Sequence, residues 1–150
     1  MSNTNLNTAE ILLVEDNMSD AELITRELKK NNLGNNLVHV KNGDEAIEFL
    51  FGTGKYAVIR DLAYQPRLIL MDLQMPKING IEVLAKIKSA PLTKHIPVVM
   101  LSSSRENTDI SRCYALGVNS YIVKPVNFES FAESISKLSE YWLLLNQAPH

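Results

Sequence analysis

The sequence predicts an α/β protein built on a doubly wound, five-stranded parallel sheet. Three observations lead to this prediction. Short apolar runs alternate five times with longer segments whose apolar residues recur at helical spacing. The runs are apolar throughout, which is typical of strands buried on both faces. Their alternation with helices favours parallel pairing, with helices covering both faces of the sheet.

The expected strands coincide with the apolar runs, and the segments between them carry start and stop signals of helices. Ser19 or Asp20 suits the N-cap of the first helix, and Asp44 and Glu45 place acids in the first turn of the second. Gly117 suits the C-terminal stop of the fourth helix. We expect strands at residues 10–15, 37–40, 67–71, 98–101 and 120–123, and helices at residues 19–30, 42–51, 80–88, 108–116 and 128–145.

The last expected helix is apolar on more than one face. One stripe at steps of three and four is expected to pack into the core, while other apolar residues lie off it. A helix of this kind is usually covered by a partner, which predicts a homodimer through the C-terminal helix. The stripe consists of Phe128, Phe131, Ile135, Leu138, Trp142 and Leu145, and the residues off it are Tyr141, Leu143 and Leu144.

A chain of 150 residues suits one domain with one hydrophobic core. We expect a flexible N-terminus over residues 1–8, the domain itself over residues 9–146, and a short tail over residues 147–150. The connection at residues 52–66 is longer than such a fold requires.

Composition and charge argue against several functional classes. A net charge of −2 without a Lys/Arg cluster disfavours a nucleic-acid partner. No apolar run approaches the ~20 residues that span a bilayer, so no membrane partner is expected. The N-terminus lacks a signal-peptide pattern, and Cys113 is the only cysteine, so no internal disulfide can form. These features together predict a cytoplasmic protein.

Chemically reactive side chains occur where the expected strands end. The first strand ends at Glu15 and Asp16, the third at Asp72, the fourth at Ser102 and the fifth at Lys124. The carboxyl ends of parallel strands meet at one edge of the sheet, where ligands bind in folds of this class. We therefore expect these side chains to share one site.

The chemistry of these groups indicates phosphoryl acceptance. Crowded carboxylates repel each other, and Mg²⁺ would relieve the repulsion with oxygens from Asp16, Asp72 and a backbone carbonyl just after Asp72. A carboxylate can also attack phosphorus and form an aspartyl phosphate. That reaction depends on charge neutralisation, which Mg²⁺ and Lys124 supply, while the Ser102 hydroxyl can donate to a phosphoryl oxygen.

Other chemistries fit the residues less well. A phosphatase of the haloacid dehalogenase type also uses an Asp nucleophile and Mg²⁺, but it would need a second acid where this chain has Gln74. No G-x-G-x-x-G follows the first strand, which argues against a nucleotide-binding domain. The "GTGK" at 52–55 lacks the remaining residues of a phosphate loop, so we expect an ordinary loop there.

Four segments, in this order and spacing, resemble the receiver domain of two-component response regulators. The resemblance covers roughly residues 9–138 and implies a flavodoxin-like fold with strand order 2-1-3-4-5. The segments are "VED" at 14–16, "MDLQMPKINGIEVL" at 71–84, "PVVMLSS" at 97–103 and "YIVKP" at 121–125.

The resemblance implies a role for each matching position. Asp72 resembles the phosphoacceptor, and Lys124 the lysine that accompanies it. Ser102 and Tyr121 stand at the two switch positions. Among these residues, Asp72, Lys124 and Ser102 would carry the phosphoryl chemistry.

The resemblance also implies how Mg²⁺ is bound. Asp16 and Asp72 would be direct ligands, Glu15 would act through water, and Gln74 would contribute its main-chain carbonyl. The bond between Lys124 and Pro125 is expected to be cis. Gln74 and Ser104 flank the site at positions expected to tune the lifetime of the phosphoryl group.

A closer resemblance is to small single-domain receivers associated with phytochrome-type histidine kinases. They share a longer segment before the third strand and an aromatic last helix, like "SEYWLLL" here. The implied phosphoryl source is a histidine kinase or a phosphotransfer protein, and the chain is expected to be a signalling protein rather than an enzyme. No output domain is expected, so the output would be a binding partner, a relay, or competition for phosphate on the kinase. The alternative is a degenerate receiver that binds partners without phosphate, which the complete set of acids, Ser102 and Lys124 argues against.

Overall fold

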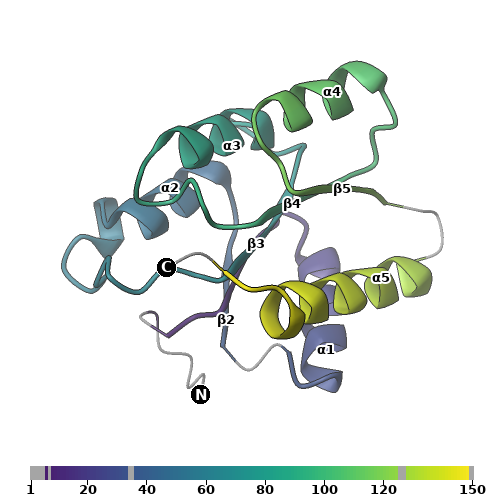
Figure 1. The fold of residues 1–150 in the computed structure, drawn as a ribbon, viewed down its shortest axis with the longest axis horizontal. Coiled ribbons are helices and arrows are strands. Elements are labelled where there is room, and N and C mark those ends of the chain that lie inside the picture. The colour runs from purple at the N-terminus through teal and green to yellow at the C-terminus, as the bar shows by residue number, and fades with distance from the viewer. Residues whose placement is uncertain (1–5, 7, 34–35, 125–127, 149–150) are drawn as a thin grey trace.

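The computed structural model describes residues 6, 8–33, 36–124 and 128–148. Most of the predicted N-terminal segment 1–8, the end of the tail 147–150 and Pro125 of the predicted cis bond lie outside these residues. Within them, five parallel strands form one sheet (Figure 1), which confirms the predicted fold. In spatial order the strands are β2 (Leu37–Val40), β1 (Ile11–Val14), β3 (Leu68–Asp72), β4 (Val98–Ser102) and β5 (Ser120–Val123).

The register of the sheet fixes where its functional residues emerge. All neighbouring strands pair in parallel, so their carboxyl ends meet at one edge. Asp72 lies opposite Leu101, and Ser102 lies opposite Val123. Every residue of β1, β3 and β4 is buried, as continuous apolar runs predict. The buried run of β3 therefore brings Asp72 to the edge at a fixed position.

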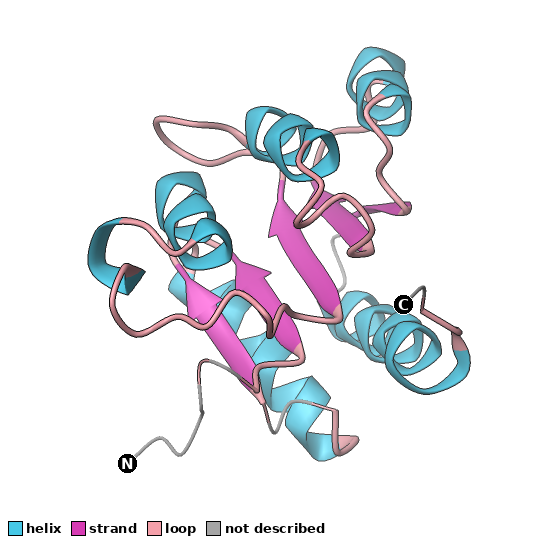
Figure 2. Ribbon diagram, turned by 60° about the vertical axis from the view of Figure 1, so that its left-hand side comes forward, coloured by secondary structure: helices cyan, strands magenta, loops and turns pink. Residues whose placement is uncertain are grey.

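Helices cover both faces of the sheet (Figure 2). On one face, α1 (Met18–Lys30) packs against α5 (Phe128–Glu140). On the other lie α2 (Gly43–Phe51), α3 (Gly80–Ser89) and α4 (Asn107–Ala115) (Figure 1). Because successive strand residues point to opposite faces, the strands feed two separate hydrophobic clusters, one beneath each helical layer.

Among the described residues, asparagine side chains cap α1, α2 and α3, which corrects one prediction. Asn17, rather than Ser19 or Asp20, is the N-cap of α1, because its side chain accepts a hydrogen bond from the Asp20 backbone N–H. Asn42 and Asn79 cap α2 and α3 in the same way. Asp20 consequently lies inside the first turn of α1, where its side chain is not needed as a cap.

The C-terminal helix departs from the predicted pattern. The regular helix ends at Glu140, and a π-helical turn follows at Tyr141–Leu145, with the Asn146 N–H donating to the Tyr141 carbonyl five residues earlier. The wider turn changes which residues face inward: Leu143 is 3% exposed, whereas Leu145 is 67% exposed. The core stripe is thus confirmed for Phe131 and wrong for Leu145. The side chain of Phe128 lies outside the description.

The connection before β3 is organised by a buried arginine. The Arg60 guanidinium donates to the carbonyls of Phe49 at 2.8 Å and Tyr64 at 2.9 Å, and to the side-chain oxygen of Gln65 at 3.2 Å. A short 3₁₀ helix, Gly54–Tyr56, occupies the "GTGK" region. Lys55 in this segment forms a salt bridge with Glu45 of α2. A lysine paired in this way fits the ordinary loop that the sequence predicts here.

None of the helices built from the described residues has both the length and the apolar character that crossing a membrane requires.

Candidate functional site

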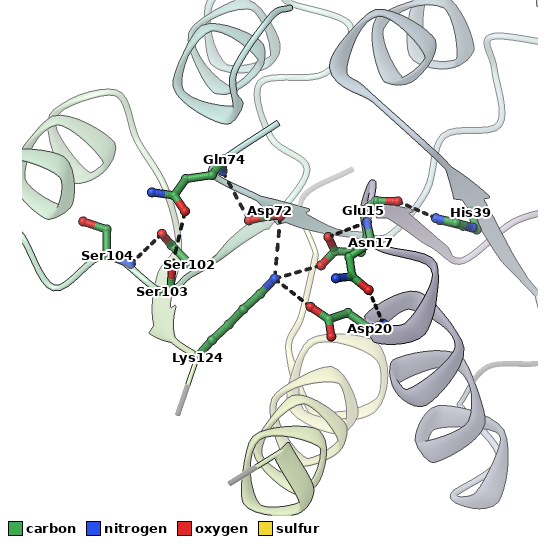
Figure 3. A network of polar contacts seen from close by, with 10 residues as sticks. All are labelled: Glu15, Asn17, Asp20, His39, Asp72, Gln74, Ser102, Ser103, Ser104 and Lys124. Atoms are coloured by element: carbon green, nitrogen blue, oxygen red, sulfur yellow. Dashed lines mark hydrogen bonds and ion pairs between the residues drawn. The ribbon is translucent and has the colours of Figure 1, made fainter. Parts of the chain in front are cut away.

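The carboxyl edge of the sheet gathers the predicted residues around one carboxylate (Figure 3). Asp72 is the last residue of β3 and is only 7% exposed. Glu15, which follows β1, is fully buried, whereas Asp16 next to it is exposed. One ligand oxygen from each of these three acids lies within 4.8 Å of the other two. The predicted acidic cluster is therefore present, with a geometry that could hold a metal ion.

The loop after Asp72 is closed tightly against the strand end. The Gln74 backbone N–H donates to Asp72 Oδ1 at 3.2 Å, which fixes one carboxylate oxygen. Farther along the loop, the Gly80 N–H donates to the Leu73 carbonyl at 2.8 Å. A Cβ on Gly80 would lie 2.6 Å from the Asp72 carbonyl oxygen, so α3 can begin this close to the site only with glycine.

Lys124 places one ammonium group among the acids. Its Nζ lies 3.0 Å from Glu15 Oε1, 3.3 Å from Asp20 Oδ2 and 3.6 Å from Asp72 Oδ2. Figure 3 shows the lysine side chain reaching from the end of β5 to this position. Lys124 thus joins three acids: Glu15 just after β1, Asp20 in α1 and Asp72 at the end of β3.

Asp20 is a site residue that the sequence analysis did not identify. Its side chain, 24% exposed, comes from the first turn of α1. In the sequence, Asp20 follows the Glu15-Asp16 pair by four residues, and it suits an N-cap of the first helix as well as a site residue. Asn17 is the cap, and the start of α1 directly after β1 turns Asp20 toward the sheet edge.

Burial and mutual repulsion hold the acids away from their ordinary pKa values. Burial first, and then the charge of Asp72, raise the pKa of Glu15 from 4.5 to about 7, against the opposing effect of Lys124. Burial likewise raises the pKa of Asp72, although Lys124 counteracts it. Burial acts to lower the pKa of Lys124, but Asp72 and Glu15 outweigh it and raise that pKa. The site carries more buried negative charge than one ammonium balances, so it favours a further cation.

Ser102 and Tyr121 are connected through Ser104. Ser102 is fully buried, and its Oγ accepts a hydrogen bond from the Ser104 backbone N–H at 3.0 Å. The Tyr121 hydroxyl donates to the Ser104 carbonyl at 3.0 Å. The Ser104 hydroxyl in turn donates to Asp109 Oδ2, in the first turn of α4, at 2.7 Å. Ser104 therefore links the end of β4 to both β5 and α4.

Gln74 connects Asp72 to the loop that follows β4. Its side-chain oxygen accepts a hydrogen bond from the Ser103 hydroxyl at 3.2 Å, so the loop after β3 contacts the loop after β4 (Figure 3). His39 contacts the Glu15 carbonyl through Nε2 at 2.7 Å, which ties β2 to the end of β1. These contacts bind neighbouring strand ends together around Asp72.

The family model of the response regulator receiver domain matches residues 11–136. The chain belongs to the response regulator receiver family. Among its relatives, Response regulator Rcp1 of Synechocystis sp. is 38% identical over 133 residues, which cover 89% of this chain and 88% of Rcp1. The probable methanogenesis regulatory protein FilR2 of Methanothrix harundinacea is 37% identical over 142 residues, 93% of this chain and 86% of FilR2.

Solved structures of receivers superpose closely on this one. The phosphorylated cyanobacterial phytochrome response regulator RcpA matches with a TM-score of 0.86 and 40% identity, over 95% of this chain and 99% of RcpA. The Mn²⁺-bound form of Rcp1 matches with a TM-score of 0.84 and 36% identity, over 93% and 98% of the two chains. The predicted resemblance to phytochrome-associated receivers is confirmed.

The buried charge of Glu15 predicts a pH-dependent stability when divalent cations are removed. A carboxyl whose pKa is raised on folding destabilises the fold as it ionises, so stability is highest below 4.5 and is lost as pH rises through about 7. We expect the unfolding free energy to fall by roughly 3 kcal/mol over this window in chelator-treated protein. Denaturant titrations at several pH values measure it.

In the Glu15→Gln variant, the unfolding free energy should decline much less with pH. The Glu22→Gln variant, which changes an exposed acid of α1, should show the same decline as wild type. Equal pH profiles for wild type and Glu15→Gln would contradict the assignment.

Proposed function

We propose that this receiver is a single-domain response regulator that accepts a phosphoryl group on Asp72. The observation that carries the proposal is the position of the Asp72 carboxylate, at the end of a buried strand, within 3.6 Å of Lys124 and inside the acidic cluster. The similarity to RcpA supports the single-domain form, because the match covers 99% of the solved RcpA chain.

The cation proposed for this site is Mg²⁺. Asp16 and Asp72 would bind it directly, Glu15 through water, and Gln74 through its main-chain carbonyl. These are oxygen donors, which suit a hard divalent ion. When bound, the ion would supply positive charge against the phosphoryl oxygens. The relative Rcp1 was solved in a Mn²⁺-bound form, which supports a divalent cation as the ligand of this chain.

The chain's own groups would carry the transfer. A carboxylate oxygen of Asp72 attacks the phosphorus of a phosphohistidine, the P–O bond forms, and the P–N bond breaks with the electron pair leaving on the imidazole. Lys124 lies beside the carboxylate and can neutralise the incoming charge. Ser102 accepts a hydrogen bond from Ser104, so its own proton remains available for a phosphoryl oxygen.

The signal would pass from Asp72 to the surface through Ser102 and Tyr121. Drawing the Ser102 hydroxyl toward the phosphoryl group would weaken its hydrogen bond to the Ser104 N–H. Because the Tyr121 hydroxyl donates a hydrogen bond to the Ser104 carbonyl, a shift of Ser104 would alter the position of the Tyr121 ring. A local charge would thereby bias the surface formed by α4, β5 and α5 between two states.

The proposed phosphoryl source is a histidine kinase or a histidine phosphotransfer protein. RcpA, which is a phytochrome response regulator, makes a kinase of the phytochrome type the first candidate. The proposed compartment is the cytoplasm, in keeping with the absence of an internal disulfide in a chain with one cysteine. Nucleic-acid and membrane partners are not proposed.

A degenerate receiver, which binds partners without phosphate, is the competing candidate. Loss of phosphorylation would be expected to leave gaps among the acids, Ser102 or Lys124, whereas this chain keeps all of these residues, with the acidic cluster and Lys124 beside Asp72. A haloacid-dehalogenase-type phosphatase is less well supported, because Gln74 stands where that chemistry needs an acid.

Incubation with Mg²⁺ and acetyl phosphate, followed by intact-mass measurement, tests the phosphoacceptor. Wild type should gain one phosphoryl group, and Asp72→Asn should gain none because it lacks the nucleophile. Lys124→Ala should be phosphorylated at least roughly tenfold more slowly, since it loses the charge beside the carboxylate. A wild-type protein that stays unmodified with every small donor, yet binds its kinase, would favour the degenerate receiver.

We also propose a homodimer through the C-terminal helix. The π-helical turn leaves Tyr141, Leu144 and Leu145 exposed by 47%, 66% and 67%, which forms an apolar patch at the end of α5. Patches of this kind mark partner surfaces.

Sedimentation velocity at high protein concentration should show a dimer for wild type and a monomer for Leu144→Glu, because a charge would be buried in the interface. Val58→Glu, at a side chain 94% exposed in the connection before β3, is the matched control and should remain dimeric. A monomeric wild type would refute the dimer.

A further inference from the structure

Lys124 contacts two acids, Glu15 and Asp20, more closely than it contacts the proposed phosphoacceptor Asp72. The ammonium lies 3.0 Å from Glu15 and 3.3 Å from Asp20, but 3.6 Å from Asp72. Two of its three hydrogens therefore have hydrogen-bond partners on the β1 and α1 side of the site. The contact to Asp72 is the longest of the three. At the described residues, it is an ion pair that is too long for a hydrogen bond.

The two acids that hold the lysine differ in what else they do. Glu15 belongs to the three-acid cluster, whose ligand oxygens lie within 4.8 Å of one another. In the part of the chain that the structure describes, that cluster does not include Asp20. A cation in the cluster would compensate the charge of Glu15, and the charge of Asp20 would then remain as the principal competitor for Lys124.

The Asp20 carboxylate does not take part in capping α1. The backbone N–H of Asp20 is capped by Asn17, and that hydrogen bond does not involve the carboxylate. The side chain is 24% exposed, so water can replace the lysine as its partner at low cost. Glu15, by contrast, is fully buried and would lose its partner without replacement.

We propose that Asp20 is a positioning residue that acts through Lys124 and restrains phosphorylation at Asp72. It competes with the phosphoryl group for the ammonium, so its charge slows phosphoryl acceptance and shortens the lifetime of the phosphorylated form. The inference rests on the proposed phosphoryl transfer to Asp72. It adds a residue that sets how readily that transfer occurs, from outside the acids that would hold the cation.

The test compares wild type with Asp20→Asn, which keeps the shape and the N-cap of α1 but removes the charge. Time courses with acetyl phosphate at saturating Mg²⁺ are followed by intact mass, and the loss of the phosphoryl group is followed after the donor is removed. Asp20→Asn should be phosphorylated roughly three- to tenfold faster, and should lose the phosphoryl group roughly two- to fivefold more slowly.

Two controls separate competition from a structural effect. Glu22→Gln removes an exposed acid from the same helix and should stay within about twofold of wild type in both rates, as should Asp20→Glu, which keeps the charge. Asp20→Ala, a second neutral variant, should reproduce the Asp20→Asn rates. Thermal unfolding of each variant verifies that the fold is intact.

Equal or slower phosphorylation of both neutral variants, with their unfolding midpoints unchanged, would overturn the proposal. This result is distinct from failure of the phosphoacceptor proposal, in which wild type itself gains no phosphoryl group under any donor.

Discussion

A single ammonium group, that of Lys124, joins three carboxylates at the carboxyl edge of the sheet. Glu15 follows β1, Asp20 lies in α1 and Asp72 ends β3, and each has a carboxylate oxygen within 3.6 Å of the lysine Nζ. That contact offsets part of the repulsion and desolvation that the buried acids meet, together with the backbone N–H groups of Asn17 and Gln74, which donate to Glu15 and Asp72. Burial first, and then the charge of a neighbouring acid, still raise the pKa of Glu15 and of Asp72, so one ammonium group does not fully offset these effects. The imbalance makes the site receptive to a cation and, with one bound, to an anionic group.

The sheet determines where this charge centre forms. Buried strands leave no freedom of register, because a shift by one residue would turn core side chains outward. Asp72 therefore emerges beside the ends of β1 and β4. Ser102 ends the neighbouring strand, and Ser104 connects it to Tyr121 and to α4. The same edge thus contains a buried carboxylate and, at the end of the neighbouring strand, a hydrogen-bonded path from Ser102 through Ser104 to β5 and α4.

The sequence predicted those parts of the molecule that depend on local pattern. The five strands and the sheet-edge positions of Glu15, Asp72 and Lys124 followed from apolar runs and the residues that end them. The family followed from the resemblance of four segments to receiver domains. Features that depend on packing between elements were not predictable. The contact of Asp20 with Lys124 requires α1 to lie beside the end of β5. The π-helical turn that buries Leu143 in place of Leu145 has no periodic signal, since it interrupts the period itself.

The central claim is that charge arriving at Asp72 is transmitted to the α4–β5 surface. Amide NMR spectra recorded before and after phosphorylation with acetyl phosphate and Mg²⁺ test it most directly. The account predicts that the resonances of Ser104, Tyr121 and Asp109 shift together with those around Asp72, while that of Val58, in the connection before β3, stays in place. None of them should shift in Asp72→Asn. Shifts confined to the immediate neighbours of Asp72 in the phosphorylated wild type would contradict the account.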